Sequence, residues 1–284
     1  MTGTRVVAIC PVYTPPELTH DRLREIAAQV DAVVVVDDGS PQRASFDGLD
    51  VHRFDENRGI AAALNEGLAA ARRLGATHVL TIDQDSRFPS DYVRELLDCG
   101  DRARRLGMRP GAVGAVEFQG LRHRGRFVDS VMRVAESIQS GTLFDLAALN
   151  EIGGFDESLV IDGVDTDACL RLQDAGYDVV AAPVAFEHTL GAGQFVSLFG
   201  KQVWSSGHDA FRRYYITRNG LALLRRHGRH HPRWALVYAR RLLVATLLAA
   251  RQPDRRPAIS RGISDGLHGR RGQRWLPSPP AVRS

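Results

Sequence analysis

Two aspartates one residue apart, Asp83 and Asp85, follow an apolar stretch of the chain. Residues 78–82 read HVLTI, which is typical of a buried strand, and the carboxylates occupy the turn after it. Carboxylates in this arrangement can converge on Mg²⁺ or Mn²⁺, because these ions take one or two protein carboxylates and complete their shell with phosphate oxygens and water. A structural alternative exists, since an acidic turn or the cap of a following helix would give the same pattern.

A second acidic pair stands at the end of another predicted strand. Residues 32–36 read AVVVV, a β-branched run typical of a strand, and Asp37 and Asp38 open the turn that ends it. These carboxylates could accept hydrogen bonds from a nucleotide base or a ribose. Turn chemistry alone would also explain them.

Polar residues mark the start of a helix predicted over residues 59–75. Asn57, Gly59 and Asn65 lie in the stretch ENRGIAAALNEG, where helix-start amides and side-chain donors could meet a nucleotide. Capping and turn formation are the alternative for each of them, most of all for Gly59.

The elements that would position these residues alternate between strands and helices. The predicted strands span residues 6–10, 32–36, 51–54 and 78–82, with helices over residues 19–30 and 59–75. This order is typical of an α/β fold with a mostly parallel sheet, in which ligands bind beyond the carboxyl ends of the strands. Pro11, Tyr13 and both acidic pairs lie at those ends, which favours one ligand site over several unrelated turns.

The rest of the chain carries a further acidic segment and a basic end. Residues 111–135 predict irregular or antiparallel strands and a polar loop, and a strand over residues 179–186 leads to His188. Helices are predicted over residues 143–152, 165–175 and 234–250, and the chain after residue 252 is expected to be loosely ordered.

These stretches together resemble the glycosyltransferases of family 2, which have the GT-A fold, and among them the bacterial rhamnosyltransferase branch. The resemblance rests on PVY, VVDDGS, ENRGIAAALNEG, TIDQDS, SGTLF, GGFDESLVIDGVDTDACLRLQDAGY, EHTLG and RRYYITRNG, which follow the family's order over residues 5–220. It implies an enzyme that moves a sugar from a nucleoside diphosphate with inversion, foremost L-rhamnose from dTDP-rhamnose. A galactofuranosyl or other hexosyl transferase that uses a UDP-sugar is the alternative within the same fold.

The resemblance also implies roles for individual residues. Asp85 would bind the divalent cation directly, with Asp83 and His188 completing the shell, and Gln84 is included only because the rhamnosyltransferase branch has it. The donor-binding set comprises Pro11, Tyr13, Asp37, Asp38, Asn57, Gly59, Asn65, Asp83 and Gln84.

Asp165, in VDTDACLR, takes the family's position for the catalytic base, which would remove the proton of the acceptor hydroxyl. Because Val164 stands where the family often has Glu, Asp162 is an alternative base, and a helix cap is the structural alternative for Asp165. The acceptor pocket is expected to be bordered by Ser140, Gly141 and Asp167.

Charge is distributed unevenly along the chain. From Lys201 onward there are 18 Lys/Arg and three acids, a balance of +15, whereas residues 1–200 have a balance of −11. The extent of the resemblance implies a GT-A domain over residues 1–220, followed by a basic helical extension over 221–284, and the charge of the extension favours an anionic partner. A polyprenyl-diphosphate-linked glycan acceptor and an anionic membrane surface fit this charge, whereas no nucleic-acid-binding motif accompanies it.

Three separate cysteines and an amino terminus without an apolar leader favour the cytoplasm, with peripheral contact at the inner face of the cell membrane. Self-association is compatible with the sequence. A response-regulator receiver is a non-catalytic alternative, because it also gathers aspartates at strand ends around Mg²⁺. It requires its acidic pair after the first strand, whereas here the pair follows the second. An inactive sugar-binding relative would not need Asp83, Asp85 and Asp165 together.

Overall fold

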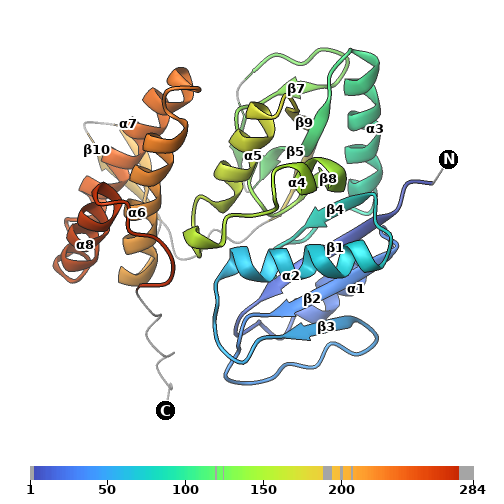
Figure 1. Ribbon diagram of the computed structural model, residues 1–284, viewed down its shortest axis with the longest axis horizontal. Helices are drawn as coiled ribbons and strands as arrows, with labels where there is room; N and C mark the ends of the chain where they lie inside the picture. The colour runs from blue at the N-terminus through green and yellow to red at the C-terminus, as the bar shows by residue number, and fades with distance from the viewer. Residues whose placement is uncertain are drawn as a thin grey trace. The chain divides into compact units, whose positions relative to one another are not determined.

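The computed structural model describes residues 3–118, 120–123, 125–187 and 207–274, and the backbone alone of residues 194–198 and 201–205 (Figure 1). Its main feature is a nine-stranded mixed sheet in the order β3-β2-β1-β4-β8-β5-β9-β7, with β6 paired to β5. The strands of this sheet are β1 (Val6–Val12), β2 (Ala32–Asp37), β3 (Asp50–Arg53), β4 (His78–Thr81), β5 (Pro110–Phe118), β6 (Leu121–Arg122), β7 (Met132–Arg133), β8 (Thr142–Asp145) and β9 (Asp178–Phe186).

The first four strands are parallel, as the sequence predicts. β1 pairs with β2 and β4, and β2 pairs with β3. β8 runs antiparallel between β4 and β5, and β5 pairs in parallel with β9. The carboxyl ends of β1, β2 and β4 therefore meet at the same end of the sheet, which is where ligands bind in α/β folds.

Helices cover both faces of this sheet. They are α1 (Thr19–Ala27), α2 (Ile60–Arg73), α3 (Tyr92–Arg105), α4 (Leu146–Glu151) and α5 (Val164–Asp174). Alternate residues of β1 face opposite layers. Ala8 belongs to the buried cluster that includes Leu23 of α1 and Leu96 of α3. Ile9 faces α2, where Gly67 has no side chain and lets the helix lie close to the strand, because a Cβ there would overlap Ile9 Cγ2.

Of two expectations for the middle of the chain, one is largely confirmed and the other is wrong at its start. Within residues 111–135, β5 pairs antiparallel with β8 and β6, and β7 pairs antiparallel with β9, whereas β5 and β9 are parallel. The helix expected over residues 143–152 begins only after β8, because the Asp145 carboxylate accepts hydrogen bonds from the backbone of Ala147 and Ala148 and so caps α4.

A second compact unit comprises residues 158–163 and 190–284, and the first comprises residues 1–157 and 164–189. The second unit contains an antiparallel pair, β10 (Gln194–Leu198) and β11 (Lys201–Ser205), and the helices α6 (Ala210–His227), α7 (Pro232–Ala249) and α8 (Arg256–Leu267). α6 packs against both α7 and α8. The expected domain boundary at residue 220 falls within α6, so the compact units divide the chain elsewhere.

The expectation of loose order after residue 252 is wrong for residues 256–267, which form α8. Two glycines of α8 let it approach the backbone of α6. A Cβ at Gly262 would lie 2.6 Å from the Tyr214 carbonyl oxygen, and one at Gly266 would lie 2.9 Å from that of Arg218. The buried Asp265 carboxylate accepts a 2.7 Å hydrogen bond from the Tyr214 hydroxyl and thereby joins the two helices.

Buried polar side chains of α6 hold the short segment 158–163. Arg218, only 1% exposed, donates to the carbonyl oxygens of Ser158 and Leu159, each at 3.0 Å. Asn219 Nδ2 lies 2.7 and 2.8 Å from the carbonyl oxygens of Ile161 and Asp162. The segment needs this support because Val160 and Asp162 have φ angles of 67° and 65°, a backbone conformation that is costly for a β-branched residue. The stretch RRYYITRNG thus has a structural role within this unit.

Candidate active site

The site begins where β1 and β4 separate. Their backbone pairing ends at Ile9 and Thr81, and a last bond runs from the Ile82 amide to the Ile9 carbonyl oxygen. Beyond this point the side chain of Gln84 replaces the missing ladder. Its Oε1 accepts a 3.0 Å hydrogen bond from the Tyr13 amide, and its Nε2 donates to the Tyr13 carbonyl oxygen at 3.3 Å. Gln84 therefore joins two strand ends, a role that the sequence did not indicate.

Asp83 and Asp85 flank Gln84 and are both half-buried. The Asp83 amide donates to the Ser140 hydroxyl at 3.0 Å, and Ser140 shares a 2.7 Å hydrogen bond with Ser86, so the acidic turn is fixed to the segment before β8. The negative charge of the pair reaches Cys10 beneath it, where burial first and then both carboxylates raise the thiol pKa.

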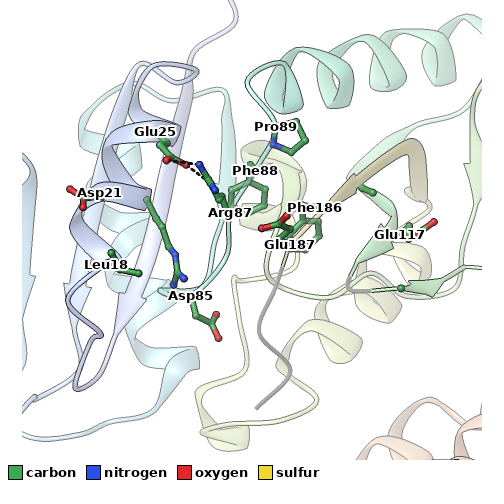
Figure 2. Close-up of a pocket in the computed structure, with 13 residues that line it drawn as sticks. Leu18, Asp21, Glu25, Asp85, Arg87, Phe88, Pro89, Glu117, Phe186 and Glu187 are labelled. Carbon is green, nitrogen blue, oxygen red and sulfur yellow. Dashed lines mark hydrogen bonds and ion pairs between the residues drawn. The ribbon is translucent and has the colours of Figure 1, made fainter. Parts of the chain in front are cut away.

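Asp85 lines a cavity of about 1100 Å³ (Figure 2). The walls come from α1, from the segment after Asp85, from the loop after β5 and from the end of β9. Carboxylates outnumber guanidinium groups in this lining, which comprises Leu18, Asp21, Arg22, Glu25, Asp85, Arg87, Phe88, Pro89, Glu117, Gly120, Ala185, Phe186 and Glu187. Such a surface favours cations. Arg87 is already paired with Glu25 at 3.0 Å, as the dashed lines in Figure 2 show.

The acidic pair after β2 has different surroundings. Asp37 is 2% exposed, and its carboxylate binds Arg53 Nη1 at 2.6 Å and the Ser40 amide at 2.9 Å. Asp38 is 5% exposed and accepts from the amides of Arg58 and Gly59 at 2.7 and 2.9 Å. Burial raises the pKa of Asp38 to about 6, although these two amides oppose the shift. Both carboxylates thus shape the loops around the site.

The three polar positions predicted near the start of α2 also differ in their surroundings. Gly59 has a φ angle of 90°, which favours glycine, and directs its amide to Asp38. Asn57, two residues earlier, is half-buried beside it. Asn65 instead lies inside α2 and pairs with the backbone of Phe155 through both its Nδ2 and its Oδ1, each at 2.9 Å. The predicted nucleotide contact of Asn65 is therefore not supported by its position.

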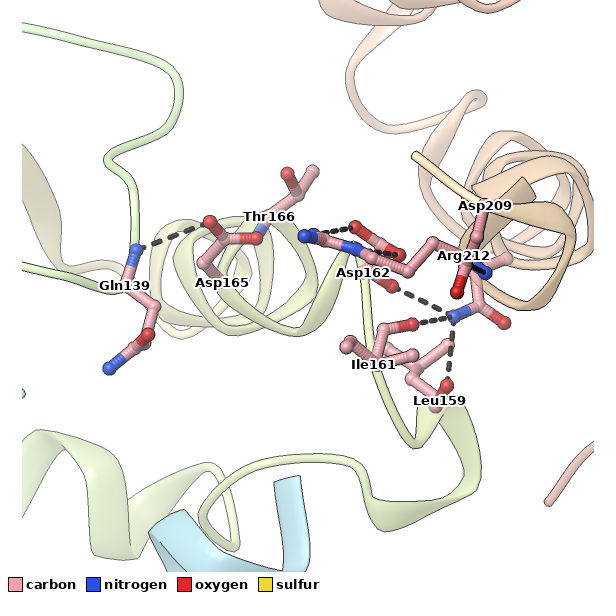
Figure 3. Close-up of polar contacts among 9 residues, drawn as sticks. Gln139, Leu159, Ile161, Asp162, Asp165, Thr166, Asp209 and Arg212 are labelled. Carbon is pink, nitrogen blue, oxygen red and sulfur yellow. Dashed lines mark hydrogen bonds and ion pairs between the residues drawn. The ribbon is translucent and has the colours of Figure 1, made fainter. Parts of the chain in front are cut away.

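Asp165 lies at the start of α5, which exposes its carboxylate partly. Its Oδ1 accepts from the Thr166 amide at 2.8 Å, and its Oδ2 accepts from the Gln139 amide at 3.2 Å (Figure 3). Gln139 directly precedes Ser140, which binds the amide of Asp83. Two adjacent residues therefore connect the candidate base with the acidic turn after β4.

The residues expected around the acceptor have structural contacts. Asp167 is fully buried and forms a 2.6 Å ion pair with Arg171, whose Nη2 also donates to the Gly154 carbonyl oxygen at 2.8 Å. Gly141 is buried with a φ angle of 78°, and a Cβ there would lie 2.6 Å from the Tyr92 hydroxyl oxygen. Asp167 and Gly141 therefore support the site from behind, and Ser140 forms part of its floor.

His188 lies outside the described residues. Glu187, which precedes it in the chain, forms an antiparallel bridge with Arg87, and the backbone hydrogen bonds between them measure 2.8 and 3.0 Å. Within the described part of the chain, no group of three or more His, Cys, Asp or Glu side chains is arranged as a metal site. The pair Asp83 and Asp85 nevertheless supplies two carboxylates, which is as many as Mg²⁺ commonly takes from a protein when phosphate oxygens and water complete its coordination shell.

Sequence reasoning missed the residues that join these parts. Gln139 acts through its backbone amide, which leaves no trace in the residue type. Arg53 and Arg171 each neutralise a buried aspartate, and only the folded chain brings Arg53 to Asp37. Arg171, four residues after Asp167, does follow a helical spacing that would have indicated the pair.

Comparison with known proteins places the chain in a family. Residues 8–106 match the family described as glycosyl transferase family 2, and residues 78–251 match glycosyl transferase family group 2. The chain is 27% identical over 293 residues to dTDP-rhamnosyl transferase RfbF of Shigella flexneri, which covers 95% of this chain and 97% of that protein. This match confirms the resemblance to the rhamnosyltransferase branch.

Solved structures confirm the predicted GT-A fold. TarS of S. aureus in complex with UDP-GlcNAc superposes with a TM-score of 0.51 at 16% identity, covering 78% of this chain and 67% of that one. GalNAc-T7 with UDP, GalNAc and Mn²⁺ superposes with a TM-score of 0.54 at 11% identity, covering 65% of this chain and 44% of that one.

Proposed function

Because the chain belongs to glycosyltransferase family 2 and is thus a sugar-transferring enzyme, we propose that it moves L-rhamnose from dTDP-rhamnose, with inversion, onto a glycan or lipid-linked glycan. The choice of donor is supported by the similarity to the Shigella flexneri rhamnosyl transferase, which extends over 95% of this chain. A role in the synthesis of cell-wall or surface polysaccharide follows from such an acceptor.

One observation carries the proposal for the reaction. Residues 139 and 140 bind Asp165 on one side and the Asp83 backbone on the other, at 3.2 and 3.0 Å. Inverting transfer requires a base near the acceptor hydroxyl and a separate group near the departing diphosphate, held in fixed relation. The segment before β8 provides that fixed relation between the two acidic sites.

Asp165 is the proposed catalytic base. Its half-buried carboxylate takes the proton of the acceptor hydroxyl as the oxygen attacks the anomeric carbon and the bond to the nucleoside diphosphate breaks. Asp162 is the weaker candidate, because its carboxylate binds Arg212 Nη2 at 2.7 Å and Nε at 3.3 Å, a bidentate pair drawn in Figure 3. Both carboxylate oxygens of Asp162 are thus bound by a charged guanidinium group, whereas Asp165 accepts from two neutral backbone amides.

A divalent cation, Mg²⁺ or Mn²⁺, fits the turn after β4. Asp85 and Asp83 would hold it together with His188, and the acidic lining of the adjoining cavity favours positive charge. When bound, it would neutralise the negative charge on the departing diphosphate.

The nucleotide is proposed to lie over the ends of β1 and β2. Pro11 and Tyr13 would border the base and ribose, and Asn57 with Gly59 would meet the nucleotide near the start of α2. Asp37 and Asp38 contribute to this region through the loops that they hold, since their carboxylates bind Arg53 and backbone amides.

A thermal-shift panel tests the donor. The full chain is heated with dTDP-rhamnose, dTDP, UDP-glucose or UDP-galactofuranose, each with MgCl₂, MnCl₂ or EDTA. We expect dTDP-rhamnose with a cation to raise the melting temperature most, because a ligand that binds only the folded state stabilises it. Stronger stabilisation by a UDP-sugar would show that the donor is a UDP-sugar and not dTDP-rhamnose. If no nucleotide changed the melting temperature, the proposed donor site would be rejected.

The base is tested in the same protein by Asp165→Asn, with Asp162→Asn as the matched control. We expect Asp165→Asn to retain the dTDP-rhamnose thermal shift yet lose transfer on the order of 10²–10⁴-fold, the usual contribution of a general base. Normal transfer by Asp165→Asn together with loss in Asp162→Asn would reverse the assignment.

A further inference from the structure

Helix α7 presents a row of large apolar side chains to the surface. Leu236, Leu243 and Leu247 are 76%, 59% and 61% exposed, and Val237 is 57% exposed. Only Trp234, Leu248 and Ala249 of this helix are buried. A helix that packs its apolar side chains into a core would show the opposite distribution.

The exposed residues share one face. Positions 236, 240, 243 and 247 are separated by four, three and four residues, so they recur on the same side of an α-helix over about 17 Å. Arg240 is exposed and stands among the three leucines. Arg241 follows on the flank, with its guanidinium 5.8 Å from the Tyr238 ring centre. We call this surface, formed by Leu236, Val237, Arg240, Arg241, Leu243 and Leu247, the α7 face.

Charge on and around the α7 face has a single sign. From residue 210 to residue 253 the chain contains ten arginines and no aspartate or glutamate. Four of these arginines lie in α7 and in the turn before it, at positions 229, 233, 240 and 241. The partner of this face must therefore accept both apolar side chains and positive charge.

Three alternatives fit the α7 face less well than contact with a membrane surface: a second copy of the chain, nucleic acid, and a helix that spans the membrane. Two copies of this face would bring Arg240 and Arg241 against the same residues without an acidic partner on either α7. Nucleic acid would satisfy the arginines but leave the leucines in water. A membrane-spanning arrangement is disfavoured because none of the helices in the described residues is long and apolar enough to cross a bilayer.

We propose that the α7 face binds the surface of a membrane that contains anionic lipid. The leucines and Val237 enter the boundary between headgroups and acyl chains, with the helix parallel to the membrane plane. Arg240 and Arg241 extend their apolar stems along the leucines and place their guanidinium groups among lipid phosphates. The inference concerns binding alone and does not depend on which sugar the enzyme transfers.

Vesicle co-sedimentation of the full chain tests this proposal. The vesicles contain phosphatidylcholine alone, or phosphatidylcholine with one third phosphatidylglycerol. We expect the protein to bind the anionic vesicles at least ten-fold more tightly than the neutral ones, and the affinity to fall as salt is raised. The triple variant Leu236→Ser, Leu243→Ser, Leu247→Ser and the double variant Arg240→Glu, Arg241→Glu should each lose at least ten-fold in binding to the anionic vesicles.

Matched controls come from the first compact unit. Leu121→Ser removes a leucine that is 40% exposed, and Arg105→Glu reverses an exposed arginine; both should bind vesicles like the unchanged protein. Circular dichroism and melting temperature confirm that each variant folds, and dTDP-rhamnose binding reports separately on the donor site. Equal binding to neutral and anionic vesicles, or unchanged binding by both α7 variants, would overturn the proposal. So would a dimer of the unchanged protein that the leucine variant converts to a monomer.

Discussion

The two acidic pairs at the ends of β2 and β4 have the same residue type and the same place in the sheet, yet their surroundings differ. Asp37 and Asp38 are 2% and 5% exposed and bind Arg53 and backbone amides. Asp83 and Asp85 are half-buried, and Asp85 borders a cavity of about 1100 Å³. Burial and the neighbouring cavity, rather than position at a strand end, separate the pair that holds loops from the pair proposed to act on a substrate.

Because of this difference, the loss of a carboxylate from each pair should affect a different property of the protein. A buried carboxylate that accepts amides contributes to folding, because its removal leaves donors without partners. A half-buried carboxylate at a cavity contributes to ligand binding, and its removal should leave the fold intact. Four substitutions test this division, and they are ordered by the size of the expected effect.

Asp85→Ala should have the largest effect. We expect transfer to fall on the order of 10²–10³-fold, the usual loss when one group that stabilises developing charge is removed. The melting temperature without ligand should change little, and the added stabilisation by dTDP-rhamnose with MgCl₂ should disappear. Asp21→Ala, which changes a carboxylate in the same cavity lining, is the control and should transfer normally. Equal losses in both variants would show that the cavity's overall charge matters, not Asp85.

Asp38 should make stability depend on pH. Its pKa is about 6 in the folded protein, above the ordinary 3.8, so the folded state keeps a proton that the unfolded state has released between these values. The stabilising contribution is complete below pH 3.8 and is lost as the pH rises through 6, by at most about 3 kcal/mol.

The measurement is urea unfolding of the unchanged protein and Asp38→Asn at pH 4.5, 5.5 and 7. Taking the difference between the two proteins cancels all groups that they share. The unchanged protein should lose unfolding free energy relative to Asp38→Asn as the pH rises. Parallel profiles would mean that burial does not disfavour the ionised carboxylate.

Asp37→Ala should destabilise the fold by about 2 kcal/mol, because it leaves the Arg53 guanidinium and the Ser40 amide without their acceptor. Arg53 is 28% exposed on its side chain, so water compensates part of the loss. Urea unfolding at pH 7 measures the change. The folded variant should still bind dTDP-rhamnose, and a loss of donor binding greater than the loss of stability would assign Asp37 to the nucleotide site.

Gln84→Met should have the smallest effect, about 1 kcal/mol of stability, since it removes two hydrogen bonds to the Tyr13 backbone at a partly exposed position. Transfer should decrease only modestly, through a less rigid acidic turn. The decrease is measured as the ratio of kcat of the Gln84→Met variant to kcat of the unchanged protein. A loss as large as that of Asp85→Ala would mean that Gln84 contacts the sugar.

The first half of the fold could be predicted because its patterns are simple. The run VVAIC buries every residue and AVVVV buries all but Ala32, and α2 shows a helical repeat of apolar residues. β5 was expected only within an irregular or antiparallel region, because the small residues of PGAVGAV do not reveal a nine-residue strand with a parallel neighbour in β9. α8 was missed for a related reason, since Gly262 and Gly266 weaken a helix pattern in sequence but permit close packing on α6.

The sequence could locate the candidate site but could not separate the residues that face a ligand from those that bind the backbone. Order along the chain placed Asp85 and Asp165 in one predicted site, and residues 139 and 140 connect Asp165 with Asp83, the other member of the acidic pair. Asn65 was interpreted as a ligand contact from its place near a helix start, and Gln84 from the resemblance alone. An amide side chain can bind a ligand or the backbone equally well. Which of the two occurs depends on long-range partners, Phe155 and Tyr13, that no local pattern specifies.

Because segment 158–163 belongs to the second compact unit, each of the two units is built from two separate stretches of the chain. The chain passes between them three times, after residues 157, 163 and 189. A protein shortened before α6 would keep Ser158–Asp162 but lose Arg218 and Asn219, the donors that those carbonyl oxygens use. The left-handed turn at Val160 would then lose these hydrogen bonds, four residues before α5 begins with Val164 and Asp165. The basic carboxyl-terminal region is therefore not a detachable appendage, and a domain-swap or deletion series should exchange residues 158–163 together with the helices.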